Sequence, residues 1–148
     1  MTTDLAVRLE IRASAFFASW GSSFDDLIDG FQAELAPDCD WDQRPMIRTK
    51  TRDRAILFLK LCHKALALEY IDVEMRSIAV VGNTVHTQRV DHLYRSDGSL
   101  IASAPVAGVL TYNGDQVEAW KEYFDPITFA AKASLSSAIW GAGKLLRR

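Results

Sequence analysis

The sequence predicts an α+β fold in which helices come first and an antiparallel sheet follows. Apolar residues recur at helical spacing up to about residue 66, and from about Leu68 they alternate with polar residues. Three turn sequences divide the alternating part into strands: Gly82-Asn83, Ser96-Asp97-Gly98 and Asn113-Gly114. Helices followed by antiparallel strands are typical of α+β proteins, with the helices on one side of the sheet.

Three helices are expected before the alternating part of the sequence that begins near Leu68. The first ends at the break Gly21-Ser22-Ser23 and carries an apolar stripe: Leu5, Leu9, Ala13, Phe16 and Trp20. The second begins at Ser23, which forms the start of a capping box with Asp26, and ends near Pro37. The third is capped by Thr51 and has one apolar side: Ala55, Phe58, Leu59, Cys62 and Leu66.

Five strands are expected, of which the first is short and peripheral. It spans residues 38–43, and Pro45 argues against its continuation as a central strand. The others are expected at 69–80, 84–94, 100–112 and 116–125. Because hairpin turns connect these four, they form a meander. A strongly bent sheet that is closed by helices makes a cone with a pocket inside.

The tail, residues 126–148, is expected to be helical, with an interruption at Gly141-Ala142-Gly143. Its apolar side predicts a cover for the pocket mouth or a subunit interface. Membrane attachment is the less favoured alternative, because one short cationic end binds lipid weakly. No repeat or linker suggests a second domain, so a single domain is expected over residues 1–148.

Composition excludes several classes of protein. A formal net charge of −2 does not supply the positive surface that nucleic-acid binding requires. Cys39 and Cys62 lack the spacing of a zinc site or a redox pair. The N-terminus has no secretory pattern and no segment approaches 18 apolar residues, so we expect a cytoplasmic protein without stable membrane insertion.

Three charged residues are candidates for acid–base chemistry. Arg89 and Asp91 share one face of the strand at 84–94, and Glu122 lies between two aromatic residues on a face of the last strand. If all three face the interior, one positive charge lies between two carboxyl groups in a medium of low dielectric constant. Such a pair retains one proton, so one carboxyl acts as acid and the other as base. These are the groups that the opening of an epoxide by water requires.

Other interpretations remain open from the residues alone. An Arg and an Asp two positions apart on a strand often form a surface ion pair that contributes little. His86 and His92 point to the opposite face, and His63 belongs to a helix edge, so all three are interpreted as polar or packing residues. No GxSxG, phosphate loop or HExxH motif occurs.

Three segments carry a resemblance to a known family: Arg89-Val90-Asp91, Ala107-Gly108-Val109-Leu110 and Trp120-Lys121-Glu122-Tyr123-Phe124-Asp125. Over most of the chain the sequence resembles limonene-1,2-epoxide hydrolase. That family shares the nuclear-transport-factor-like fold with SnoaL-like cyclases and ketosteroid isomerase. The resemblance implies a cone-shaped, curved, mixed sheet that is mostly antiparallel, packed by N-terminal helices, with a C-terminal helix over or near the pocket.

The resemblance also implies a mechanism: hydrolysis in one step, without a covalent ester, a metal or another cofactor. Asp91 would be the acid, Arg89 would bridge both acids, and Glu122 would be the base, where the family has Asp. The family's Tyr-x-Asn, which helps the base to hold water, matches Trp41-Asp42-Gln43. Trp41 and Gln43 are therefore the expected water-positioning residues, although Trp41 can only donate a hydrogen bond.

Strand parity and the position of the tail predict the lining of the pocket: Leu93, Ala104, Val106, Phe124 and Phe129. An apolar lining favours a small neutral, apolar epoxide. The resemblance further implies a homodimer. Two alternatives remain, a SnoaL-like cyclase or isomerase of a polyketide or terpenoid, and a non-catalytic binding domain of the same fold.

Overall fold

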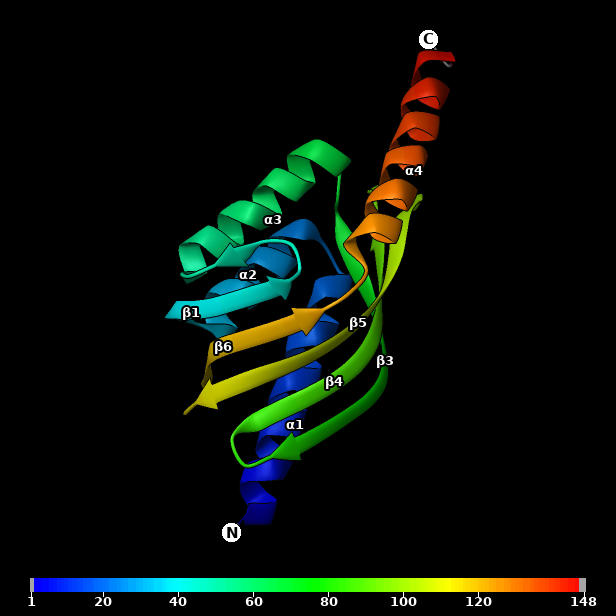
Figure 1. The fold of residues 1–148 in the computed structure, drawn as a ribbon. Helices are drawn as coiled ribbons and strands as arrows, with labels where there is room; N and C mark the ends of the chain where they lie inside the picture. Colours follow the sequence, from blue (N-terminus) through cyan, green and yellow to red (C-terminus); the bar gives the residue numbers. More distant parts are fainter. Residues whose placement is uncertain (1, 147–148) are drawn as a thin grey trace.

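The computed structural model describes the backbone of residues 2–146 and the side chains of residues 4–146. Three α-helices precede the four-stranded meander, as predicted, and two strands lie between the second and third of these helices in the chain (Figure 1). The elements follow in the order α1 (Thr2–Ala18), the 3-10 helix η1 (Ser19–Gly21), α2 (Phe24–Glu34), β1 (Leu35–Arg44), β2 (Arg48–Thr49), α3 (Arg52–Leu66), β3 (Tyr70–Val81), β4 (Thr84–Tyr94), β5 (Leu100–Asn113), β6 (Gln116–Tyr123) and α4 (Pro126–Leu146).

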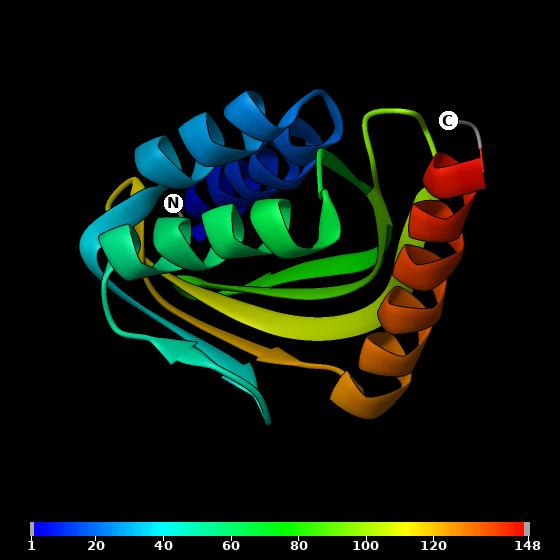
Figure 2. The same cartoon turned by 90° about the horizontal axis from the view of Figure 1, so that it is seen from above.

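The six strands form one mixed, curved sheet in the order β2-β1-β6-β5-β4-β3. Strands β3 to β6 pair with their sequence neighbours in antiparallel fashion, which confirms the predicted meander. Helices α1, α2 and α3 lie over the concave side of the sheet, and α4 stands against its far end (Figure 2). This arrangement confirms the predicted cone, closed by helices on one side.

The prediction for the first strand was wrong in extent and in position. Strand β1 spans ten residues instead of six, and it lies between β2 and β6 rather than at the edge. Pro45 did not place it at the edge because β1 ends at Arg44, just before the proline. Pro37, where α2 was expected to end, lies in an irregular part of β1 between Leu35 and Asp40. A short segment with prolines near both ends gives no periodic signal for its pairing with β6.

Local capping interactions determine where α2 and α3 begin. The Ser23 Oγ atom accepts a hydrogen bond from the Asp26 backbone N–H at 3.1 Å, and Thr51 Oγ1 accepts one from the Arg54 N–H at 3.2 Å. Both caps satisfy a backbone donor that has no partner within its helix. Both predicted helix starts are therefore confirmed.

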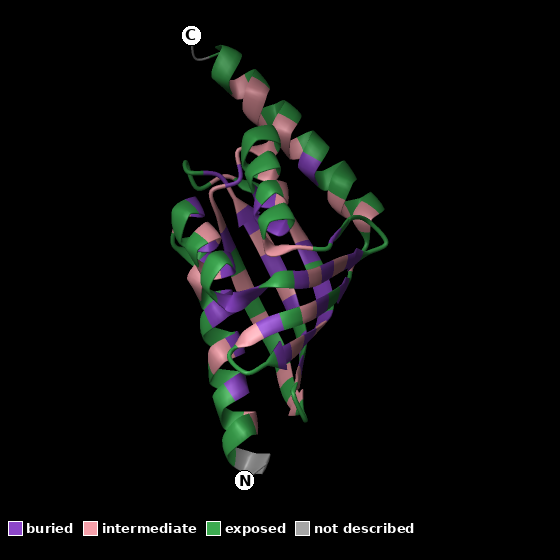
Figure 3. Cartoon of the chain, turned by 90° about the vertical axis from the view of Figure 1, so that its left-hand side faces the viewer, coloured by how far each residue is buried: buried purple, intermediate pink, exposed green. Residues whose placement is uncertain are grey.

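Aromatic side chains fill the closed part of the cone between the helices and the sheet. The cluster comprises Phe16, Phe17, Trp20, Phe31, Trp41 and Trp120. Trp41 and Trp120, neighbours across β1 and β6, stack with ring centroids 4.7 Å apart. Buried and exposed residues alternate along the strands (Figure 3), as expected for a sheet with one face in the core.

Side-chain hydrogen bonds hold helix α4 against the loop between β4 and β5. The buried guanidinium of Arg95 donates hydrogen bonds to Ser136 Oγ at 3.2 Å and to Ser137 Oγ at 3.0 Å. Trp140 Nε1 donates to Asp97 Oδ2 at 2.8 Å. The predicted interruption at Gly141-Ala142-Gly143 was wrong, because the helix continues to Leu146. Within residues 2–146, no helix is both long and apolar enough to cross a membrane.

Candidate active site

Arg89 and Asp91 of β4 reach Glu122 of β6 across the intervening strand β5. Glu122 pairs with Gly108 of β5, and Gly108 pairs in turn with Thr87 of β4. A Cβ atom on Gly108 would lie 3.2 Å from the Lys121 carbonyl oxygen and 3.4 Å from Arg89 Nη1. The glycine therefore leaves the space through which the guanidinium passes from β4 to β6.

Arg89 bridges the two carboxyl groups. Its Nε donates to Asp91 Oδ1 at 2.8 Å and its Nη2 to Asp91 Oδ2 at 3.1 Å. Nη2 also donates to Glu122 Oε2, and Nη1 donates to Thr87 Oγ1 at 3.4 Å. The three charged residues are buried, with exposed fractions of 1% for Arg89, 3% for Glu122 and 8% for Asp91. Such a fork of charge-assisted bonds fixes both carboxylates relative to each other.

Burial and the neighbouring charges shift the pKa values of Glu122 and Arg89. Burial raises the pKa of Glu122, and the negative charge of Asp91 raises it further, while Arg89 and the Trp41 N–H act to lower it. Burial acts to lower the pKa of Arg89, but the two carboxylates outweigh it, so the pKa is raised and the guanidinium stays charged. One fixed positive charge between two acids favours a state in which the pair holds a single proton.

Trp41 and Gln43 approach Glu122 from β1, which runs parallel to β6. Gln43 is the register partner of Glu122, and Trp41 Nε1 donates a hydrogen bond to Glu122 Oε1 at 2.9 Å. The amide Nε2 of Gln43 is buried and has no hydrogen-bond partner among the described residues. Trp41 therefore holds the carboxylate itself, whereas the Gln43 amide retains a free donor.

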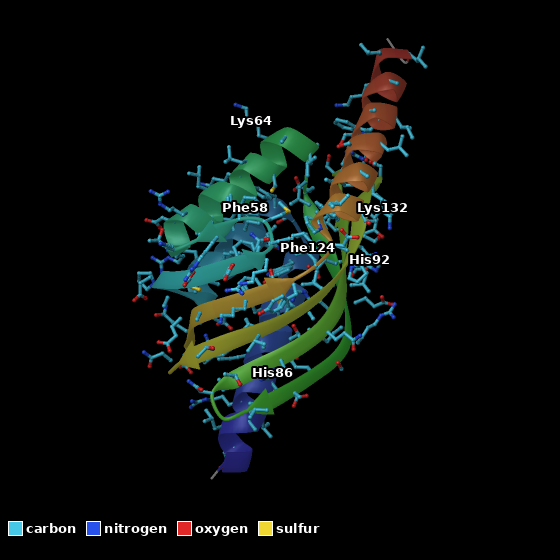
Figure 4. The ribbon with its side chains drawn as sticks, in the orientation of Figure 1. Phe58, Lys64, His86, His92, Phe124 and Lys132 are labelled. Carbon is cyan, nitrogen blue, oxygen red and sulfur yellow. The ribbon has the colours of Figure 1, made fainter. Side chains whose placement is uncertain are left out.

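A cavity of about 110 Å³ opens beside these groups. Its polar residues, Gln43, Arg89, Asp91 and Glu122, belong to β1, β4 and β6. Its other walls are apolar and include all five residues expected from the sequence: Leu93, Ala104, Val106, Phe124 and Phe129. Phe58 of α3 and Phe124, which follows β6, are labelled in Figure 4, and both line the cavity. A compact, largely apolar molecule with one polar end fits such a cavity.

The lining predicted from the sequence included no residue of α3, but four residues of its apolar side line the cavity: Phe58, Leu59, Cys62 and Leu66. Trp20, Phe31 and Met46 line it as well. A helical stripe does not reveal whether it faces filled core or a cavity, so periodicity held no signal for this role. The pKa of Cys62 is raised to about 11 by burial, so at neutral pH this side chain is a thiol and a poor nucleophile.

The three histidines lie outside the lining of this cavity. His63 stacks on Phe24 with centroids 4.2 Å apart, and its Nδ1 is 2.5 Å from the Leu68 carbonyl oxygen. His92 Nδ1 is 2.7 Å from Ser103 Oγ, and His86 is exposed. Among residues 2–146, no three His, Cys, Asp or Glu side chains are grouped so that they could hold a metal ion.

A family model, the limonene-1,2-epoxide hydrolase catalytic domain, matches residues 14–134. The chain belongs to this family. The matched segment contains Trp41, Gln43, Arg89, Asp91 and Glu122. No curated protein gives a significant match to the sequence.

Solved structures of related fold include a limonene-epoxide-hydrolase-like epoxide hydrolase from M. tuberculosis. It is 17% identical, has a TM-score of 0.70, and the match covers 93% of this chain and 98% of that one. A SnoaL-like polyketide cyclase described from Jannaschia sp. CCS1 is 15% identical, with a TM-score of 0.71 and coverage of 88% and 94%. A ketosteroid-isomerase-like protein from Catenulispora acidiphila is 15% identical, with a TM-score of 0.64 and coverage of 83% and 92%. At these identities the likeness shows the fold alone, which is the nuclear-transport-factor-like fold of SnoaL-like proteins.

Proposed function

We propose that this member of the limonene-1,2-epoxide hydrolase family adds water directly to a small, neutral, apolar epoxide and releases a vicinal diol. One observation carries the proposal: Arg89 holds Asp91 and Glu122 together beside an apolar cavity. Two carboxyls that share one proton supply both an acid and a base. The family membership supports the same chemistry.

Glu122 is the base in this proposal. It removes a proton from a water molecule while the water oxygen forms a bond to one epoxide carbon. A raised pKa makes the ionised carboxylate a stronger base than an ordinary glutamate. Trp41 orients Oε1, and the free N–H of Gln43 holds the oxygen of the attacking water. The additional methylene of Glu122, compared with the family's Asp, brings its carboxylate within reach of Trp41.

Asp91 is the acid. Its proton moves to the epoxide oxygen as the carbon–oxygen bond of the ring breaks, so no free alkoxide has to leave. In one turnover a proton leaves Asp91 and a proton arrives at Glu122, while Arg89 remains charged and contacts both. Return of the proton from Glu122 to Asp91 restores the starting state. The overall reaction adds one water molecule to the substrate.

Heavy-oxygen water under single-turnover conditions tests the direct attack of water. We expect the label in the diol and none in the protein, as shown by mass spectrometry of both. Label in the carboxylate of Asp91 or Glu122 would show a covalent ester and contradict the proposed mechanism. Asp91→Asn and Glu122→Gln are expected to lower kcat by about 100-fold or more, because each removes one half of the acid–base pair.

A second candidate function is that of a SnoaL-like cyclase or isomerase. The fold shared with the Jannaschia protein favours it, since a substrate hydroxyl or acidic carbon can replace water beside the same base. The mass of the product separates the two, because hydration adds one water and isomerisation adds none. A non-catalytic binding domain would turn over no epoxide of a broad panel, and its Asp91→Asn and Glu122→Gln variants would bind ligands as well as the parent protein.

We also propose that the chain acts as one domain and forms a homodimer through the outer face of its sheet. Small and apolar side chains, among them Val90, Pro105, Ala107 and Val109, lie on that face. Sedimentation velocity would contradict the dimer if the protein sedimented as a monomer at micromolar concentration.

A further inference from the structure

Two residues that line the cavity each carry a buried hydrogen-bond donor without a partner among the described residues: Gln43 through Nε2 and Trp20 through Nε1. Folded proteins pair nearly all buried polar atoms, because an unpaired donor loses its hydration without compensation. Both residues are more than nine-tenths buried, with exposed fractions of 8% and 3%. An unpaired donor on a residue that lines a cavity indicates a place where a bound molecule can complete the hydrogen bond.

The two donors have different neighbours. Gln43 is the register partner of Glu122, so the attacking water of the proposed reaction accounts for its amide. Trp20 comes from η1 and lies beside Arg89, whose guanidinium carbon is 5.6 Å from the centre of the indole ring. The attacking water therefore accounts for Gln43 and leaves the indole N–H without an acceptor.

We propose that Trp20 is a specificity-determining residue whose N–H binds an oxygen acceptor of the substrate, a few bonds away from the epoxide. That the substrate is an epoxide rests on the function proposed above, whereas the binding of an acceptor oxygen by Trp20 does not. The acceptor is neutral, such as a carbonyl, ether or hydroxyl oxygen. A carboxylate or phosphate would add negative charge next to Asp91 and Glu122, which already occupy Arg89. The substrate class is accordingly a neutral epoxide with one further oxygen function.

The competing explanation is that the indole N–H rests on a neighbouring ring. Phe17 lies 4.9 Å from Trp20 between centroids, with the ring planes at 65°, so such a contact is geometrically available. N–H contacts with rings are weak compared with hydrogen bonds to oxygen. Trp120 supplies a matched control, because its Nε1 is also buried and unpaired but the residue does not line the cavity.

Cyclohexanone and methylenecyclohexane test the inference, since they share their shape and differ in one acceptor oxygen. Isothermal titration calorimetry should show that the unmodified protein binds the ketone about ten-fold or more tightly than the alkene. Trp20→Phe should reduce this preference by about five-fold or more, because it removes the N–H and keeps an aromatic ring. Trp120→Phe should leave the preference unchanged.

Equal binding of the two ligands by the unmodified protein would overturn the inference, even if no variant folded. A preference that survives in a folded Trp20→Phe protein would overturn it too, and would place the indole N–H on its aromatic neighbours. Neither ligand is an epoxide, so turnover does not enter the measurement. A protein that forms no diol yet prefers the ketone would contradict the proposed function alone.

Discussion

At the scale of single residues, Glu122 determines how the site responds to pH. Burial raises its pKa above the ordinary value of 4.5, so this group takes up a proton at a higher pH than an exposed glutamate does. The proposed reaction requires ionised Glu122. We therefore expect kcat/KM to fall as the pH decreases through the raised pKa of the folded protein, before exposed carboxylates titrate. A pH–rate profile without a descending acidic limb above about pH 4.5 would contradict the role of Glu122 as base.

The same shift has a consequence for stability. Since the folded-state pKa is raised, the contribution of Glu122 to stability is fully present below the pKa of the unfolded chain and is lost as the pH rises through the folded-state pKa. Glu122→Gln carries no charge at any pH, so its melting temperature should rise relative to that of the parent across this window. Thermal unfolding of both proteins at a series of pH values measures the difference. A constant difference between them would show that burial does not perturb Glu122.

At the scale of elements, the site depends on the close approach of β4, β5 and β6. Gly108 on β5 lies under the guanidinium that connects the other two strands. Gly108→Ala should lower the free energy of unfolding by about 1–3 kcal/mol. Neither the Lys121 carbonyl nor Arg89, which is hydrogen-bonded to both Asp91 and Glu122, can easily move away from the added methyl group. It should also reduce kcat by displacing Arg89 from Glu122.

Denaturant unfolding and steady-state kinetics measure these effects, with Asp115→Asn as the control. Asp115 is exposed in the turn between β5 and β6, away from the site and from the proposed dimer face, so its variant should behave as the parent does. If Gly108→Ala were as active and as stable as that control, Arg89 would not require the space above the glycine.

At the scale of the whole molecule, α4 is held at one end of the sheet and also contributes to the lining of the cavity. Arg95 binds α4 through Ser136 and Ser137, and its guanidinium carbon lies 4.8 Å from the centre of the Trp140 ring. Phe129 of the same helix lines the cavity. Arg95→Met should therefore loosen α4, raise KM more than it lowers kcat, and increase amide hydrogen exchange in residues 126–146 while β3 to β6 remain protected. Unchanged exchange in α4 would show that apolar contacts alone hold the helix.

The sequence by itself determined the fold class, the meander and the faces of its strands. Alternation of period two is a local property. Without knowledge of the fold, it places Arg89 and Asp91 together on one face of their strand, and Trp120 and Glu122 together on one face of theirs. The caps at Ser23 and Thr51 are local as well, since donor and acceptor lie three positions apart.

Only the tertiary structure decided what meets at the site. The parallel pairing of β1 with β6 joins segments about 80 positions apart, and it brings Trp41 onto Glu122 and leaves Gln43 with a free donor. Such pairing depends on packing and loop closure, which leave no periodic trace in a ten-residue strand with prolines near both ends. For the same reason the sequence shows Trp20 as one more apolar residue of a helical stripe. Only the assembled helices and sheet place Trp20 beside the cavity and leave its N–H without a partner.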